Sequence, residues 1–418
     1  MSAPQPRPSL LDAASSAQTS RPAPGTDTVW HGAWTTPAMR PSTAPWFATW
    51  AEQGFHNHSL RQIVRVSAGG TTVRIRLSNA YGTAPLRLAG ASIGHTLSGA
   101  TMQPGSLRTL LFEGAASVTV PAHGRAVSDP VTLPTQPLQK LTITLYFQAA
   151  TGPATYHQLS MATTYRATGN HLHSPAATAY SDKIEPGYGS WYYLEGIETA
   201  GGPPWPPAVV AFGDSLTDGF GATIDGDDRY PDLLAARLIA AGRPRPVLNA
   251  GIGSNKLLTA SALGGDAGIA RFTRDVLDQP RVGTVIALIG INDLQQSDDA
   301  AGGAGRDVPP VTARRLIGGH RALIRAAHAR NVRIIGATLT PYRGAAGWSV
   351  TGESVRAQVN EWIRGSGAYD AVVDFARALA LDSGDRIRED LHIGDHLHPN
   401  PAGYQAMADA VDLAALEQ

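Results

Sequence analysis

The sequence predicts an α/β protein in two folded parts: an all-β sandwich of jelly-roll type, then a doubly wound three-layer α/β/α domain with a five-stranded parallel sheet. From Ala208 onward, strand-like and helix-like segments alternate, which is typical of a parallel sheet with helices on both faces. From about Val29 to Thr199, short strand-like segments are separated by Gly, Pro and Ser turns, which favours a sandwich. Residues 201–207 (Gly-Gly-Pro-Pro-Trp-Pro-Pro) form a stiff proline-rich linker between the two parts.

The first part begins with two segments of alternating polarity. Residues 62–66 alternate apolar and polar side chains, Gly69 and Gly70 turn the chain, and residues 73–77 alternate again. This pattern predicts a hairpin with one solvated face. The long stretch 149–182 is loop-like in composition and long enough to cover a neighbouring domain. Further strands are expected at 86–88, 110–112, 117–120, 141–147 and 191–197.

The second part alternates strands and helices in sequence. Strands are expected at 209–212, 246–249, 285–289, 334–338 and 371–375, and helices at 230–241, 267–277, 311–330, 354–364 and 401–416. We therefore divide the chain into a lead of disordered composition (1–28), a β-sandwich domain (29–200), the linker (201–207) and an α/β domain (208–418).

Composition excludes several classes of function. The chain has 418 residues, with 34 Lys+Arg against 34 Asp+Glu, so no basic excess indicates a nucleic-acid partner or an anionic membrane surface. Cysteine is absent, which excludes disulfides and cysteine catalysis.

No apolar run approaches the roughly 18 residues of a membrane span, so no transmembrane segment is expected. The first 28 residues lack the apolar core of a signal peptide, and secretion with the signal already removed is favoured over a cytoplasmic location. We expect no cofactor, because no phosphate loop or dinucleotide fingerprint is present.

Polar residues follow several of the strands expected in the α/β domain. Ser215 follows the first, a glycine-rich loop that contains Gly253 and Ser254 follows the second, and Asn292 follows the third. A late loop just before the final helix, residues 394–400, carries Asp395 and His398. Because ligands bind beyond the carboxyl ends of parallel strands, these side chains are expected on one rim.

The chain resembles the GDSL, or SGNH, hydrolase family over about residues 208–418. Residues 213–216 (Gly-Asp-Ser-Leu) resemble the first family block, 290–293 (Gly-Ile-Asn-Asp) the third, and 395–399 (Asp-His-Leu-His-Pro) the last. Three blocks in the correct order are far more specific than any one of them. The resemblance implies a flavodoxin-like catalytic domain and a serine ester hydrolase, and some carbohydrate esterases of this family also carry an N-terminal β-sandwich.

The second block departs from the family pattern. Family members usually have a glycine five residues after an asparagine, with its N–H in the oxyanion hole. Counted from Asn249, that position is Ser254, and the glycine lies one residue earlier at Gly253. A backbone donor survives the exchange if the backbone angles accept a Cβ, so Ser254 is the first choice for this donor and Gly253 the second.

The residue types predict an acyl-enzyme mechanism. Ser215 needs a base to take its proton, His398 is that base, and Asp395 orients the far ring nitrogen. The Ser215 N–H, the Ser254 N–H and the Asn292 amide are expected to form the oxyanion hole. Tyr342 and His396 are candidate substrate-binding residues on the rim. Asp214 is a further candidate, although bracing of the nucleophile loop explains it more simply.

The expected substrate is a small-molecule or polysaccharide ester, most simply one with a short acetyl-type acyl group. A lipolytic or aryl esterase of the same fold is the alternative, and a catalytically impaired glycan-binding protein is the alternative of another class. Two pairs, His56 with His58 and His171 with His173, each lack a third ligand, so no metal site is expected. The sequence leaves the oligomeric state open.

Overall fold

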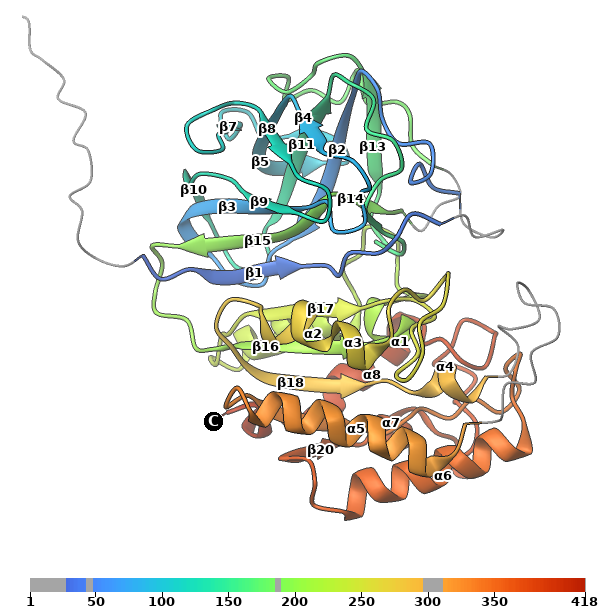
Figure 1. Cartoon of the computed structure of the whole chain (residues 1–418). Coiled ribbons are helices and arrows are strands. Elements are labelled where there is room, and N and C mark those ends of the chain that lie inside the picture. Colours follow the sequence, from blue (N-terminus) through green and yellow to red (C-terminus); the bar gives the residue numbers. More distant parts are fainter. Residues whose placement is uncertain (1–27, 43–47, 185–188, 296–310, 418) are drawn as a thin grey trace, which may run out of the picture.

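The computed structural model describes residues 28–42, 48–184, 189–295 and 311–417. The strands of the first half stack on the α/β half, and the first described residues lie at the side of the molecule (Figure 1). The expected lead, 1–28, lies outside the described residues except for Thr28.

Two antiparallel sheets share one apolar core in the first half, which makes it a β-sandwich. Valine, isoleucine and leucine side chains from both sheets fill that core. Two short pairs lie beside them, β12 (Tyr156–His157) with β14 (Trp191–Tyr192) and β4 (Leu86–Leu88) with β8 (Val118–Val120). The first sheet contains β1 (His31–Thr35), β15 (Leu194–Ala200), β3 (Gly70–Ser78), β10 (Val131–Thr135) and β9 (Arg125–Val127). The second contains β13 (Thr164–Thr168), β2 (His58–Arg65), β11 (Lys140–Phe147), β5 (Gly90–Ser98), β6 (Thr101–Met102) and β7 (Arg108–Leu110).

The predicted hairpin between residues 62–66 and 73–77 is wrong. The strands exist, but β2 pairs with β11 and β13 in one sheet, whereas β3 pairs with β15 and β10 in the other. The chain therefore crosses between the sheets at Gly69 and Gly70. A Cβ on Gly69 would lie 2.4 Å from the Thr135 carbonyl oxygen, so glycine is required there. Strand β2 is buried along most of its length, so it has no solvated face.

The second half contains the predicted five-stranded parallel sheet. Its strand order is β17 (Val247–Gly251), β16 (Ala208–Gly213), β18 (Val282–Leu288), β19 (Arg333–Ala337) and β20 (Ala371–Val373). The order reverses between the first two strands of the domain and the rest, which is the flavodoxin-like arrangement. Right-handed crossovers then send the helices to opposite faces of the sheet.

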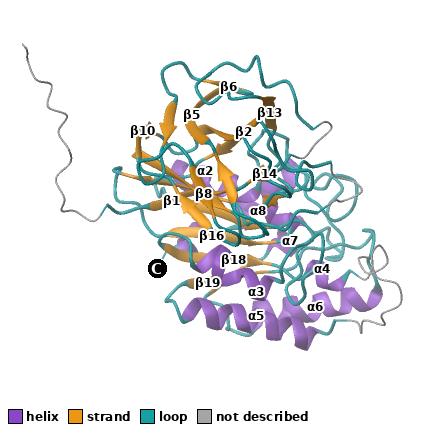
Figure 2. Ribbon diagram, turned by 45° about the horizontal axis from the view of Figure 1, so that its top comes forward, coloured by secondary structure: helices purple, strands orange, loops and turns teal. Residues whose placement is uncertain are grey.

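Helices cover both faces of this sheet (Figure 2). Each long helix lies within a few residues of its predicted range, and α6 begins earlier because the Ser349 side chain accepts a hydrogen bond from the Gly352 N–H. The expected final helix ends sooner and is followed by a separate 3₁₀ turn. The helices are α1 (Ser215–Asp218), α2 (Tyr230–Ala240), α3 (Gly268–Phe272) with the π turn η1 (Thr273–Leu277), α4 (Ile291–Leu294), α5 (Ala313–His328), α6 (Val350–Gly365), α7 (Phe375–Leu379), α8 (Pro401–Ala410) and the 3₁₀ turn η3 (Leu413–Leu416).

The two halves contact each other along two edge strands, β1 and β17 (Figure 1). The Ser67 hydroxyl donates to the Val247 carbonyl oxygen at 2.8 Å and accepts from the Val247 N–H at 3.0 Å. In the linker, the Trp205 indole N–H donates to the Gly69 carbonyl oxygen at 2.9 Å. The stretch 149–182, which also contains β12 and β13, contributes Met161 to the core of the α/β half. The contacts of Trp205 and Ser67 therefore hold the sandwich at the amino ends of β16 and β17, and Met161 adds a contact with the core of the α/β half.

Candidate active site

Ser215 lies at a sharp turn between β16 and α1. A Cβ on Gly213 would lie 2.4 Å from the Leu288 carbonyl oxygen, so only glycine allows β16 to approach β18 this closely. The Asp214 carboxylate caps α1 and accepts a hydrogen bond from the Leu216 N–H at 3.1 Å. The turn therefore places the Ser215 side chain at the first position of the short helix, where it is 6% exposed.

The three residues predicted as the catalytic set lie in one hydrogen-bonded row. The Ser215 Oγ is 2.9 Å from the His398 Nε2, and the His398 Nδ1 is 2.6 Å from the Asp395 Oδ2. Because a carboxylate only accepts, the Nδ1 carries the ring proton, and the lone pair of Nε2 faces the serine hydroxyl. This is the tautomer that a general base requires.

Asp395 is held in its ionised form by its own turn. Burial alone would raise the pKa of the carboxyl, but the hydrogen bonds from His398 and from the Leu397 N–H lower that pKa to about 2. The His398 ring also packs edge-on against Phe220, with 4.7 Å between the ring centroids. The Tyr404 hydroxyl in turn donates to the Phe220 carbonyl oxygen at 2.7 Å. The base is therefore fixed from two sides.

Two backbone donors near the nucleophile have no acceptor among the described residues: the N–H groups of Ser215 and Ser254. Ser254 has a φ of 59°, in the left-handed region, so the backbone accepts a Cβ there. The N–H of Gly253, by contrast, donates to the Asp218 Oδ2 at 2.9 Å. Of the two predicted alternatives, Ser254 is therefore the donor left available, and Gly253 is engaged elsewhere.

Asn292 lies at the start of α4, buried beside the same loop. Its Nδ2 donates to the Asn255 carbonyl oxygen at 3.0 Å, which leaves the second amide proton available. The next residue, Asp293, accepts the N–H groups of Leu257 and Leu258 at 2.6 Å and 3.0 Å. The predicted asparagine is thus joined to the loop that carries Ser254.

Two of the three candidate substrate-binding residues are corrected by their burial. Asp214 is 0% exposed, and burial raises the pKa of its carboxyl to about 7, with the charge of Asp293 adding to the rise. Tyr342 is also 0% exposed and packs in the core of the α/β half. Both residues support the fold instead of facing a ligand. His396 is partly exposed and stays a candidate, with its ring against Gly344.

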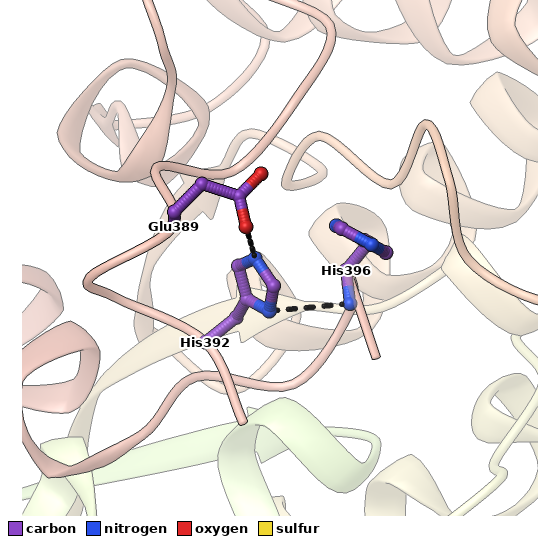
Figure 3. A group of neighbouring side chains, drawn as sticks. All are labelled: Glu389, His392 and His396. Carbon is purple, nitrogen blue, oxygen red and sulfur yellow. Dashed lines mark hydrogen bonds and ion pairs between the residues drawn. The ribbon is translucent and has the colours of Figure 1, made fainter. Parts of the chain in front are cut away.

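His396 also belongs to a group of three possible metal ligands, with Glu389 and His392 (Figure 3). The His392 Nδ1 accepts the N–H groups of Gly394 at 2.9 Å and His396 at 3.3 Å. The proton of that ring is therefore on Nε2, which faces the Glu389 Oε2 at 3.3 Å. A metal ion would need the Nε2 lone pair, so this arrangement fits a hydrogen-bonded turn better than a metal site. Neither of the two histidine pairs in the β half forms part of this group.

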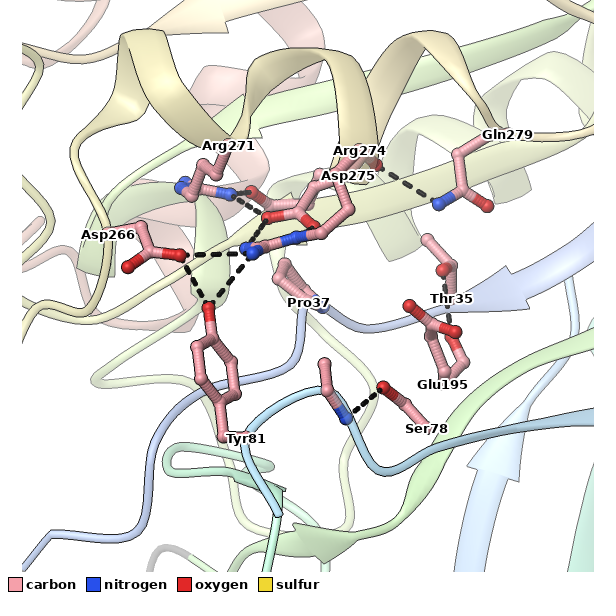
Figure 4. A network of polar contacts seen from close by, with 12 residues as sticks. Thr35, Pro37, Ser78, Tyr81, Glu195, Asp266, Arg271, Arg274, Asp275 and Gln279 are labelled. Carbon is pink, nitrogen blue, oxygen red and sulfur yellow. Dashed lines mark hydrogen bonds and ion pairs between the residues drawn. The ribbon is translucent and has the colours of Figure 1, made fainter. Parts of the chain in front are cut away.

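A buried arginine that the sequence did not single out joins the catalytic loops. Arg271 donates to the carbonyl oxygens of Gly213 and Ala250 at 2.7 Å and 2.8 Å, and to the Asn255 Oδ1 at 3.0 Å. Figure 4 shows that Arg271 continues through Asp275 into a polar network that reaches the β half. A lone arginine in a helical segment gives no sequence signal of such a role, because its acceptors are main-chain atoms.

That network ends at Tyr81, which follows β3 in the β half (Figure 4). The Tyr81 hydroxyl donates to the Asp266 Oδ2 at 2.6 Å and accepts from the Arg274 Nη1 at 2.9 Å. Arg274 also pairs with Asp275 at 2.7 Å. The β half is therefore linked by polar contacts to the helix beneath the catalytic loops.

Comparison with known proteins gives one family match. Residues 211–406 match the model of the GDSL-like Lipase/Acylhydrolase family. No curated protein matches the chain. Among the described helices, none is long and apolar enough to cross a membrane.

Solved structures align with about half of the chain. An alpha/beta hydrolase enzyme from the metagenome of Lake Arreo is 23% identical, over 51% of this chain and 95% of that chain, with a TM-score of 0.39. An acetyl xylan esterase is 22% identical, over 49% of this chain and 96% of that chain, with a TM-score of 0.36. A carbohydrate acetylesterase from Sinorhizobium meliloti is 16% identical, over 50% of this chain and 100% of that chain, with a TM-score of 0.38.

Proposed function

The C-terminal half of this chain belongs to the GDSL-like lipase/acylhydrolase family of ester hydrolases, and from that premise we propose that Ser215, His398 and Asp395 carry the reaction. The observation that carries the proposal is the unbroken row from Ser215 Oγ through His398 to Asp395, with contacts of 2.9 Å and 2.6 Å. A serine hydroxyl is a weak nucleophile until an adjacent base removes its proton, and this row supplies that base.

In the acylation step, His398 Nε2 takes the Ser215 proton as Oγ forms a bond to the ester carbonyl carbon. The carbonyl oxygen becomes an oxyanion, and the Ser215 N–H, the Ser254 N–H and the Asn292 amide are its donors. Asp395 stays ionised, because its pKa of about 2 lies far below the working pH, and it stabilises the imidazolium. The tetrahedral intermediate then collapses, and the leaving alkoxide takes the proton from Nε2.

The deacylation step repeats this chemistry with water. His398 Nε2 removes a proton from a water molecule, whose oxygen attacks the acyl carbon of the ester on Ser215. Collapse releases the carboxylic acid and returns the proton to Ser215 Oγ. The protons balance over the two steps, because the Ser215 proton leaves on the alcohol and a proton of the water replaces it on Oγ.

The finer proposal is that the acyl group is short, of the acetyl type, and that the alcohol is a carbohydrate. The Leu159 side chain of the β half packs against Gly253, beside the Ser254 N–H, and we take this close packing to favour a small acyl group. The equal numbers of cationic and anionic side chains suit a neutral substrate. A neighbouring β-sandwich also resembles the arrangement in some carbohydrate esterases.

The test is a substrate panel with wild type and two variants. Hydrolysis of p-nitrophenyl acetate should fall by roughly 10³-fold or more in Ser215→Ala, and should be unchanged in Ser354→Ala, an exposed serine on α6. A wild-type rate in Ser215→Ala would refute this nucleophile, whereas an inactive wild type would favour a binding protein.

The same panel separates the substrate classes. Wild-type kcat/KM should be highest for acetyl esters, decline with acyl length from acetate to palmitate, and extend to acetylated xylan. A preference for long acyl chains would overturn the short-acyl proposal and favour a lipolytic enzyme. A preference that follows the aryl alcohol, whatever the acyl group, would favour an aryl esterase.

A further inference from the structure

A histidine of the β half reaches into the turn that carries the nucleophile. His157, in β12, is 2% exposed and lies 61 positions before Asp218, the last residue of α1. Its Nε2 is 2.9 Å from the Asp218 Oδ1, and its Nδ1 is 3.0 Å from the Pro37 carbonyl oxygen. Neither the proposed mechanism nor the family match uses this residue.

Both ring nitrogens of His157 face oxygen atoms that accept hydrogen bonds. The Pro37 carbonyl can only accept, so Nδ1 carries a proton. The contact between Nε2 and the Asp218 carboxyl contains one more proton, so the two side chains share a buried hydrogen bond. His157 is thus held between two oxygen atoms from distant parts of the chain, and its partner Asp218 is only 3% exposed.

Asp218 also contacts the loop that carries Gly253 and Ser254. Its second oxygen, Oδ2, accepts the Gly253 N–H at 2.9 Å. A Cβ on Gly253 would lie 2.5 Å from the Leu159 side chain, so the β half also restricts this loop directly. Ser254 follows immediately, and its N–H is the donor left available. The position of that donor therefore depends on contacts made by His157 and Leu159.

We propose that His157 is a positioning residue of the hydrolase: its bond to Asp218 holds that carboxyl, which fixes Gly253 and so aims the Ser254 N–H at the oxyanion. This inference rests on the proposed function, and it assigns the β half a part in catalysis. A domain present only to bind substrate would need no buried polar contact at the nucleophile turn.

The surroundings of the pair hold the His157 ring in place. The Trp191 ring stacks on the His157 ring at 5.7 Å, with Arg229 also 5.7 Å from the Trp191 ring. The stacked indole therefore fixes the orientation in which the His157 Nε2 reaches Asp218.

Two substitutions of His157 test the proposal in the full-length protein. In His157→Leu the shape is filled but the donor to Asp218 is lost, so kcat for p-nitrophenyl acetate should fall by about 10-fold or more with little change in KM, as for a weakened oxyanion hole. In His157→Gln the Nε2 still donates to Asp218, so most of the lost kcat should return. Affinity for a boronic acid that mimics the tetrahedral intermediate should fall by the same factor as kcat.

Each outcome has a defined meaning. A wild-type kcat in folded His157→Leu, with Ser215→Ala inactive, overturns the positioning role and leaves the proposed function intact. Equal losses in the Leu and Gln variants, with lowered thermal stability and unchanged affinity for the boronic acid, would make His157 a structural residue. An inactive wild type would refute the proposed function instead.

A spectroscopic measurement covers the case in which the leucine variant does not fold. In ¹⁵N-labelled protein, the Gly253 amide resonance should shift strongly in Asp218→Asn and far less in His157→Gln, because Asp218 joins His157 to the Gly253 N–H. A Gly253 amide resonance that does not move in Asp218→Asn would overturn the inference, whatever the activity.

Discussion

Ser254 and Gly253 show that a side-chain contact at one residue and the backbone angle of the next determine which of the two is a glycine. Gly253 has no room for a Cβ, because the Leu159 side chain fills that space. Ser254 has a φ of 59°, which costs a residue with a Cβ about 1–2 kcal/mol relative to the right-handed region. The contact with the β half therefore places the glycine at 253, and the loop keeps its backbone donor at 254 despite the serine side chain.

Asn292 gives a prediction at the same scale. Replacement by alanine removes the free amide proton, so kcat should fall by roughly 10²–10³-fold with a smaller change in KM. Steady-state kinetics on a short ester measure this, and thermal unfolding shows whether the lost bond to Asn255 matters for the fold. A kcat equal to that of wild type would leave Asn292 as a purely structural residue.

Sequence patterns reach some of these residues and not others. Four residues lie in short blocks at the ends of expected strands or in the late loop: Ser215, Asn292, Asp395 and His398. For these residues the sequence predicts both the chemistry of the side chain and its position near the others. His157 has no local pattern, because its acceptors, the Pro37 carbonyl and Asp218, are 120 and 61 positions away. Burial is a second property that no sequence pattern shows: Tyr342 follows a strand end, but its side chain is buried in the core.

At the scale of elements, the short helix α1 carries an unusual cap. Asp214 caps it with a carboxyl that is 0% exposed and has one oxygen without a partner among the described residues. The unfolded carboxyl titrates near pH 4 and the folded one near 7, so between about pH 4 and 7 the folded protein binds more protons. The free energy of unfolding contributed by this site therefore falls as the pH rises through that window.

Asp214→Asn should abolish this dependence and keep the cap, because an amide oxygen can still accept the Leu216 N–H. The free energy of unfolding of the variant, minus that of wild type, should increase between pH 5 and pH 8. Urea unfolding at the two pH values measures it, with Asp412→Asn at the exposed cap of η3 as the matched control. A difference that stays constant with pH would contradict the protonated cap.

The elements themselves were predicted unequally well. The parallel sheet was predictable because its strands are apolar runs separated by long helical segments, and β18 and β19 lie where expected. The β half was harder, because pairing depends on contacts far apart in the chain. Strand β5, central in its sheet between β11 and β7, was missed, since its glycines and serine hide the apolar alternation.

At the scale of the whole molecule, polar contacts as well as apolar ones join the two halves. Tyr81 in the β half contacts both Asp266 and Arg274, and burial raises the pKa of its hydroxyl to about 12. The phenol therefore stays protonated and donates to Asp266 across the physiological range. This contact and the Asp218–His157 pair lie on the same side of the α/β half as the catalytic loops.

Removal of that hydroxyl tests how much the junction contributes to stability. Tyr81→Phe should lower the free energy of unfolding by about 1–3 kcal/mol, because hydrogen bonds to charged groups are stronger than neutral ones. Tyr146→Phe is the matched control, since it loses only a bond to the neutral Asn57 side chain within the β half. Equal losses in the two variants would show that the junction contributes no more than an ordinary hydrogen bond.

The position of β1 beside β17 has a consequence for how these molecules behave in a crowded solution. An uncovered edge strand of a parallel sheet offers unpaired backbone groups to any other chain, and so invites aggregation. Strand β17 is one edge of its sheet, and Ser67 of the β half occupies both the N–H and the carbonyl of Val247 there. The opposite edge, β20, has only three residues, too few to nucleate a stack of chains. The sandwich thus covers the edge of the sheet at which another chain could otherwise pair.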